Sequence, residues 1–319
     1  MKTLIIDGFA FALPLFIIAV AGIYSERSGI INLALEGIQG FGAFTGALAV
    51  VLIASYADPH ASYLPYMALI FAAMGGIVAA GVHALLCIRF KANHIISSVV
   101  VNILAMATTV FLTKQINAVF FSRPSDKFIL SVFPRFTVPY LSEIPFLGYA
   151  FMDVYTFLPI IILVALMSYV LLYKTPYGLH LRACGENPQA VDACGISVAN
   201  TRYSAVLISG ALAGLGGICF AYLNSASFSP GIYLGNGYLA IAALIFGNWR
   251  ITPTLWACLF FGFARSGGYR LSQYLALPGS FSDLVMILPY ILTLLLLVLF
   301  SKNSRAPKAL GDIYDKGKR

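Results

Sequence analysis

Long apolar runs separated by short polar intervals extend along almost the whole chain. A helix needs about 20 apolar residues to cross the hydrocarbon core of a bilayer. The runs that meet or approach this length are residues 4–24, 29–55, 63–88, 94–113, 153–173, 203–223, 234–248, 252–266 and 283–300. The pattern therefore predicts an all-α, polytopic transmembrane bundle of about nine spans.

The seventh and eighth runs, 234–248 and 252–266, are short for spanning helices. Glycine or proline stands near their ends, at Gly235, Gly247 and Pro253. Short or interrupted helices of this kind are typical of the region around a transporter's binding site or gate. We therefore expect this part of the chain to contribute to a substrate path.

Composition supports a membrane protein with a single domain. Of the 319 residues, 60% are hydrophobic and only 10% are charged, and the mean hydropathy is +0.88. A soluble domain carries about 25% charged residues. We expect one transmembrane domain over residues 1–300 and a basic, flexible tail over 301–319 that is attracted to lipid headgroups.

Basic residues indicate how the chain is oriented. If the C-terminus is cytoplasmic, 13 of the 20 lysines and arginines fall on the inner side. Cytoplasmic loops are richer in Lys and Arg, so the bias places the polar interval 174–202 inside the cell and the segment 114–152 outside it. The same bias explains the formal charge of +8 without nucleic-acid binding.

Polar residues inside the second run are candidates for a substrate path. Asn32, Glu36 and Gln39 recur at helical spacing and predict one polar helix face, which lines a path or joins two helices. Arg27 is the expected partner of Glu36, and a structural role for Glu26 and Glu36 is favoured over substrate contact. The full set expected along the path is Asn32, Glu36, Gln39, Phe41, Phe44, Asn102 and Asn236.

A short helix is predicted inside the interval 174–202. Asn187 is a good N-cap, Pro188 suits the first helical position and Gly195 suits a left-handed C-terminal turn. These signals predict a helix over residues 188–194. Spacing leaves two roles open, a docking element for a soluble partner and a plain connector.

Motifs of catalysis are missing from the sequence. It contains no G-x-x-x-x-G-K-[ST] phosphate loop, no H-E-x-x-H, no G-x-S-x-G and no Cys/His metal spacing. We therefore expect no enzymatic activity, no cofactor and no metal site in this chain.

Three segments resemble one transporter family. They are SERSGIINLALEG (25–37), GENPQAVDACGI (185–196) and ALIFGNW (243–249). The chain resembles the permease subunits of bacterial ATP-binding cassette (ABC) importers for branched-chain amino acids, ribose and nucleosides. It is most similar to the shorter permease of the nucleoside importers. Val191 and Thr254 depart from the family pattern.

The resemblance implies a multi-component importer in the bacterial inner membrane. Its partners would be a separate ABC ATPase subunit, a second, non-identical permease and an external substrate-binding lipoprotein. Helix 188–194 would be the coupling helix, and the residues implied in ATPase contact are Glu186, Asn187, Pro188, Gln189, Ala190, Asp192 and Gly195. Sugars and branched-chain amino acids are alternative substrates, and an ion-coupled secondary transporter using Glu26 and Glu36 is the alternative mechanism.

Overall fold

The structure is a computed structural model, and it describes part of the chain. The described residues are 2–56, 58, 61–130, 132–144, 147–231, 233–275, 287, 291 and 305–316. The predicted ninth span, 283–300, lies outside the described residues apart from positions 287 and 291.

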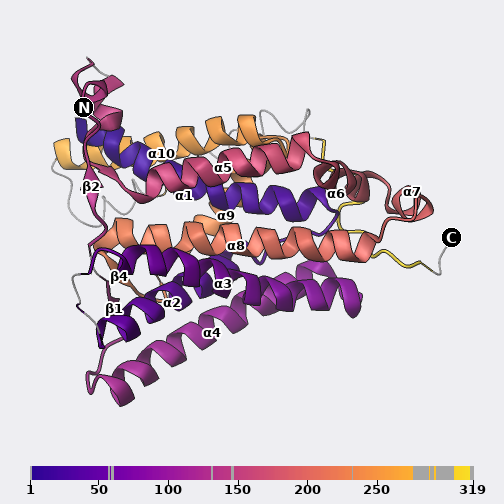
Figure 1. Ribbon diagram of the computed structural model, residues 1–319, viewed down its shortest axis with the longest axis horizontal. Helices are drawn as coiled ribbons and strands as arrows, with labels where there is room; N and C mark the ends of the chain where they lie inside the picture. Colours follow the sequence, from indigo (N-terminus) through magenta and orange to yellow (C-terminus); the bar gives the residue numbers. More distant parts are fainter. Residues whose placement is uncertain are drawn as a thin grey trace.

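Helices dominate the described residues (Figure 1). The helices are α1 (Lys2–Arg27), α2 (Leu35–Ala54), α3 (Leu64–Ala84), α4 (His94–Phe120), α5 (Phe157–Lys174), α6 (Pro176–Glu186), α7 (Pro188–Ala193), α8 (Val198–Ser225), α9 (Asn236–Phe246) and α10 (Ile251–Tyr274). The shorter elements are the π-helical η1 (Leu85–Arg89), the 3-10 turns η2 (Leu141–Glu143) and η3 (Leu147–Phe151), and strands β1 (Phe128–Ile129), β2 (Arg135–Phe136), β3 (Val154–Tyr155) and β4 (Ser227–Phe228).

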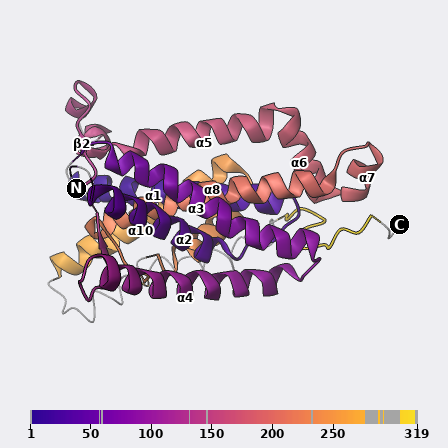
Figure 2. The same ribbon diagram turned by 60° about the horizontal axis from the view of Figure 1, so that its bottom comes forward.

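Six of the described helices are long and apolar enough to cross a membrane: α1, α2, α3 with η1, α4, α5 and α8. Helices α1 and α8 are the most buried of them, whereas α4 and α5 lie on the outside of the bundle (Figure 2). A polytopic helical bundle is therefore present. The described residues do not confirm nine spans.

The predicted eighth span ends too early. Helix α10 continues to Tyr274, eight residues beyond the predicted end at 266. Two arginines near the predicted end, which made this region look like a polar loop, have partners on α1. The Arg265 guanidinium stacks 4.1 Å from the Phe11 ring centroid, and Arg270 lies 3.6 Å from Asp7. Paired charges can extend a helix that composition alone would end.

The two ends of the bundle differ in architecture. Helices α6 and α7 and the chain's C-terminus lie at one end, and the N-terminus and the four short strands lie at the other (Figure 1). Strand β1 pairs with β4 and β2 with β3, and Lys2 lies 3.4 Å from Asp153. The predicted external segment begins after Phe120 and not at 114, and its Phe128 and Phe133 are buried against the bundle.

Small residues let α2, α3 and α8 pack closely. A Cβ placed on Gly42 would lie 2.4 Å from the Gly214 Cα, and a Cβ on Gly76 would lie 2.0 Å from the Gly210 carbonyl oxygen. Both distances are shorter than van der Waals contact. These glycines therefore bring helices of one chain together, as small-xxx-small patterns do in lipid.

Candidate functional site

Helix α9 begins inside the bundle, and Glu36 binds its first turn. The helix has 11 residues, which is about 16 Å, roughly half the thickness of a bilayer core. Oε1 of Glu36 accepts a hydrogen bond from the Gly235 N–H at 2.5 Å, and Oε2 accepts one from the Gly237 N–H at 2.7 Å. The carboxylate, only 5% exposed, thus caps an interrupted helix.

Two glycines make this contact possible. Gly235 has a φ of +88°, a left-handed conformation that side chains rarely adopt. A Cβ on Gly237 would lie 2.6 Å from Oε2 of Glu36, so a larger residue there would displace the carboxylate. A negative charge at a helix N-terminus is favourable because the free N–H groups and the helix dipole both point toward it.

Arg27 is not the partner of Glu36, contrary to the sequence prediction. Its Nε donates to the Trp249 carbonyl oxygen at 2.9 Å, and its Nη1 lies 3.8 Å from Glu186. The prediction relied on proximity in sequence. The actual partners of Glu36, Gly235 and Gly237, are about 200 positions away, and no local pattern indicates them.

Gln39 and Asn102 complete a polar junction with Glu36 and Asn236. The Gln39 amide donates to Oε2 of Glu36 and to the Tyr233 carbonyl oxygen, both at 3.2 Å. Asn102 on α4 accepts from the Gly37 N–H at 2.8 Å.

The Asn102 amide also donates to the Leu33 carbonyl oxygen at 3.0 Å and to the Tyr238 hydroxyl at 3.2 Å. Asn236 is the first residue of α9 and is buried. The polar junction, defined as Glu36, Gln39, Asn102 and Asn236, therefore joins α2, α4 and α9.

Asn32 does not share a helix face with Glu36 and Gln39. Helix α2 begins at Leu35, and residues 28–34 form a turn, because Gly29 has a φ of +97° and the chain reverses there. The Asn32 amide instead donates to the Ser209 hydroxyl on α8 at 3.1 Å. Among the residues that the structure describes, its Oδ1 and the Oε1 of Gln39 are buried acceptors without a partner, which marks both side chains as open to a further donor.

The two predicted aromatic path residues lie toward the strand end of the bundle. Phe44 is 2% exposed and packs against Phe41, Phe128 and Phe228, with ring centroids 5.9–6.0 Å apart. Since β1 and β4 supply Phe128 and Phe228, Phe44 holds this pair of strands on the bundle. Its observed contacts are packing contacts.

A second buried network was missed by the sequence analysis. The Trp249 indole N–H donates to Oε2 of Glu26 at 2.5 Å, and the Trp249 carbonyl oxygen accepts from Arg27. Asn248 and Trp249 both have positive φ values, 52° and 54°, in the turn between α9 and α10. The Gly247–Asn248 pair after an apolar run is a turn signal that could have indicated it.

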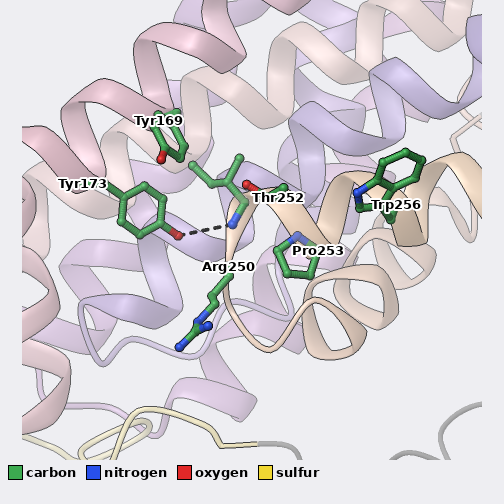
Figure 3. Close-up of a pocket in the computed structure, with 7 residues that line it drawn as sticks. Tyr169, Tyr173, Arg250, Thr252, Pro253 and Trp256 are labelled. Carbon is green, nitrogen blue, oxygen red and sulfur yellow. Dashed lines mark hydrogen bonds between the residues drawn. The ribbon is translucent and has the colours of Figure 1, made fainter.

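A cavity of about 600 Å³ lies beside this turn, between α5 and α10 (Figure 3). The Tyr173 hydroxyl accepts a hydrogen bond from the Ile251 N–H at 3.2 Å, which ties the end of α5 to the start of α10. The lining residues are Tyr169, Tyr173, Arg250, Ile251, Thr252, Pro253 and Trp256. Sequence reasoning singled out only Pro253 among them.

The predicted short helix exists as α7, one residue shorter than expected. The Asn187 side chain accepts from the Ala190 N–H at 3.0 Å, and Gly195 has a φ of +79°. Pro188 and Val191 are buried, so they face the protein. Among the residues predicted to meet an ATPase, those on the exposed side are Glu186, Asn187, Gln189, Ala190 and Gly195.

Asp192 differs from these exposed residues. Its carboxylate lies 3.4 Å from the Lys316 ammonium and its side chain is 26% exposed. Asp192 is therefore turned toward the C-terminal segment, whereas the sequence prediction had it facing an ATPase.

Replacing Glu36 by Gln should destabilise the protein. A neutral amide loses the charge-assisted bonds from Gly235 and Gly237 and turns an N–H₂ group toward one of those donors. The expected loss is about 1–3 kcal/mol in the free energy of unfolding, measured as a lower midpoint of thermal unfolding in detergent. Glu143→Gln, at an exposed carboxylate, is the matched control and should leave the midpoint unchanged. Equal midpoints for the two variants would contradict a capping role for Glu36.

Several known proteins similar to this chain are named as ABC transporter permeases. The guanosine ABC transporter permease protein NupQ of Bacillus subtilis (strain 168) is 39% identical, over 97% of this chain and 95% of NupQ. The nucleoside ABC transporter permease protein NupC of Lactococcus lactis subsp. cremoris (strain MG1363) is 35% identical, over 100% and 98%. The guanosine ABC transporter permease protein NupP of Bacillus subtilis is 27% identical, over 95% and 82%. No solved structure matches this chain significantly.

The family itself is identified by a match over most of the chain. The model of the family described as "Branched-chain amino acid transport system / permease component" matches residues 4–297. This range includes the polar junction, α7 and every other described helix, apart from the first two residues of α1. The chain is therefore a multi-pass membrane protein that belongs to this permease family.

Proposed function

We propose that this chain is a permease subunit of an ATP-driven ABC importer for nucleosides. The observation that carries the proposal is similarity over nearly the full length to permeases whose names specify guanosine and nucleoside transport, at 39% and 35% identity. The alternatives are import of a sugar or of a branched-chain amino acid by the same kind of machine.

The importer would contain three further components. ATP hydrolysis takes place on a separate ABC ATPase, and an external lipoprotein delivers the substrate. A second, non-identical permease completes the path. Bacillus subtilis contains two relatives of this chain, NupQ and NupP, both named as guanosine ABC transporter permeases, which supports pairing of two different permeases.

The chain lies in the bacterial cell membrane with its C-terminus in the cytoplasm. The excess of basic residues on the side of α6, α7 and the C-terminus supports this orientation. The ATPase would then bind the exposed side of α7, which Asn187 and Gly195 hold at its two ends. Val191 faces the protein, so its departure from the family pattern alters packing beneath α7 and leaves the docking side unchanged.

The substrate path would run beside the polar junction. Asn32 and Gln39 each present a buried acceptor that has no partner within the described part of the chain, and Asn236 stands at the start of the interrupted helix α9. Hydroxyl and amino groups of a nucleoside are donors that match such acceptors. Glu36 and Asn102 act as the supports that fix these residues in place.

Reconstituted transport tests the proposed function. The complete complex, in liposomes that enclose ATP, should accumulate radiolabelled guanosine when the external binding protein is added. Unlabelled nucleosides should compete for uptake, and glucose and leucine should not. The control is the same complex loaded with ADP. If only glucose or only leucine competed, the substrate would be a sugar or a branched-chain amino acid instead of a nucleoside. Uptake driven by an ion gradient without ATP would overturn the ATP-driven mechanism.

A substitution in the loop of α7 should uncouple ATP hydrolysis from transport. Gly195→Val forces a β-branched residue into a left-handed conformation, at a cost of about 1–3 kcal/mol, although a Cβ there meets no atom within 4 Å. The end of α7 should shift, and stimulation of ATP hydrolysis by the loaded binding protein should fall.

Gly231→Val is the matched control for this substitution. Gly231 is also open to solvent around its Cβ but lacks a positive φ, and it follows β4 at the opposite end of the bundle. The readouts are ATP hydrolysis in liposomes and co-purification of the ATPase. Full stimulation in Gly195→Val would show that this loop is only a connector.

A further inference from the structure

The C-terminal segment is bound along the α7 end of the bundle. Residues 305–316, called the C-terminal strap below, carry hydrogen bonds and ion pairs to five different parts of the chain. The sequence predicted a flexible basic tail here. Figure 1 shows this segment, in yellow, at the end of the bundle where α6 and α7 lie.

Two backbone hydrogen bonds attach the middle of the strap. The Ala309 N–H donates to the Gly185 carbonyl oxygen, next to α7, at 2.8 Å. The Gly311 N–H donates to the Gly29 carbonyl oxygen at 2.9 Å, in the turn that connects α1 and α2. One short stretch of the strap therefore holds α6–α7 and the α1–α2 turn together.

Arg202 on α8 reinforces the same connection. Its side chain, only 3% exposed as a residue, donates through Nη1 to the Asp312 carbonyl oxygen at 3.1 Å and through Nε to the Ser28 carbonyl oxygen at 3.1 Å. A buried guanidinium that bridges two carbonyl oxygens fixes their separation, because its planar fork of donors is rigid. The strap and the α1–α2 turn are thus held on α8 by one side chain.

Both ends of the strap reach further connections. The Arg305 N–H donates to Oδ1 of Asn248 at 2.8 Å, in the strained turn between α9 and α10. The Asp315 carboxylate lies 2.9 Å from the ammonium of Lys91, in the connection between η1 and α4. The strap therefore contacts the connections that precede α2 and α4 and the turn that follows α9. These are the three helices of the polar junction.

The strap also forms part of the support of α7. Tyr314 packs against the small apolar cluster of Cys184, Val191 and Val198, which lies beneath α7. Burial and the hydrogen bond to Asp192 raise the pKa of Tyr314, so its hydroxyl stays protonated and donates to that carboxylate. The Lys316 ammonium lies 3.4 Å from the same carboxylate.

We propose that the C-terminal strap is a positioning element for energy coupling, through which a displacement of α7 by the ATPase reaches the inner ends of α2, α4 and α9. The proposal rests on the proposed function, because it requires an ATPase on α7. It assigns to residues 305–316 a role beside that of the α7 loop, since Tyr314 packs against the small cluster that contains Val191 of α7.

A pair of truncations tests the strap. A chain that ends at Ile313 lacks Tyr314 and Lys316 but keeps the backbone bonds of Ala309 and Gly311. The matched control ends at Lys316 and removes only residues 317–319. In the complete complex, the ratio of substrate-stimulated to basal ATP hydrolysis should fall severalfold in the first chain and stay at the wild-type value in the control. Equal ratios in the two chains, with the ATPase bound to both, would overturn the proposal.

A charge exchange provides a test that does not depend on truncation. Asp192→Lys and Lys316→Asp should each lower the same ratio by up to about fivefold, the change expected when an exposed ion pair is broken. The double variant restores the pair in reverse and should recover the wild-type ratio. Recovery in the double variant would show that Asp192 acts through its ion pair with Lys316. If Asp192 instead contacted the ATPase directly, Lys316→Asp would not restore the ratio.

The two proposals fail in different ways. If the wild-type complex shows no stimulation of ATP hydrolysis by the loaded binding protein, the proposed function is wrong. If the wild-type complex is stimulated and the single charge variants keep the wild-type ratio, the strap proposal is wrong and the proposed function stands.

Discussion

The capping of α9 by Glu36 is the interaction on which the interior of this bundle depends. In a bilayer each backbone N–H must find a partner within the protein, because no water is present to supply one. A helix that begins inside the bundle exposes its first N–H groups, and Glu36 accepts two of them, from Gly235 and Gly237. This carboxylate therefore stabilises the start of α9 inside the bundle.

The surrounding residues follow from that requirement. Gly237 must lack a side chain to admit the carboxylate, and Gln39 donates to its second oxygen. Asn102 then fixes the start of α2 from α4 through the Gly37 N–H. This arrangement explains why polar groups that are costly in lipid gather at one point of the fold.

Helix α9 connects this point with the α7 end of the bundle. Its first turn binds Glu36, and the strained turn after its last residue holds Trp249 against Glu26 and Asn248 against the C-terminal strap. A shift of the strap thus acts on a short helix whose other end carries the polar junction. Short or interrupted helices are typical of the region around a transporter's binding site.

Local patterns in the sequence predicted the apolar helices and the ends of α7. Periodicity and caps depend on neighbouring residues, and the Asn187 cap and the left-handed Gly195 appear as predicted. Three predictions that depended on distant contacts were wrong. Glu36 binds Gly235 instead of Arg27, Asn32 lies in a turn before α2, and α10 continues past 266, where Arg270 pairs with Asp7 on α1.

The order of the C-terminal strap was missed for the same reason. The contacts of Arg202 and Lys91 with the strap join residues more than a hundred positions apart. Net charge and a lack of apolar periodicity are equally typical of a free tail and of a bound one. Gln39 and Asn236 are brought to one place by the packing of α2 against the start of α9, which no local pattern indicates.

In the proposed importer, α7 is the part of the permease that meets the ATPase. The most direct measurement is photo-crosslinking from single positions in the assembled complex. A crosslinker at Ala190, exposed on α7, should capture the ATPase, and one at Ile129, exposed on β1 at the opposite end, should not. Capture of the ATPase from Ile129, or no capture from Ala190 in a complex that hydrolyses ATP, would contradict binding of the ATPase at α7.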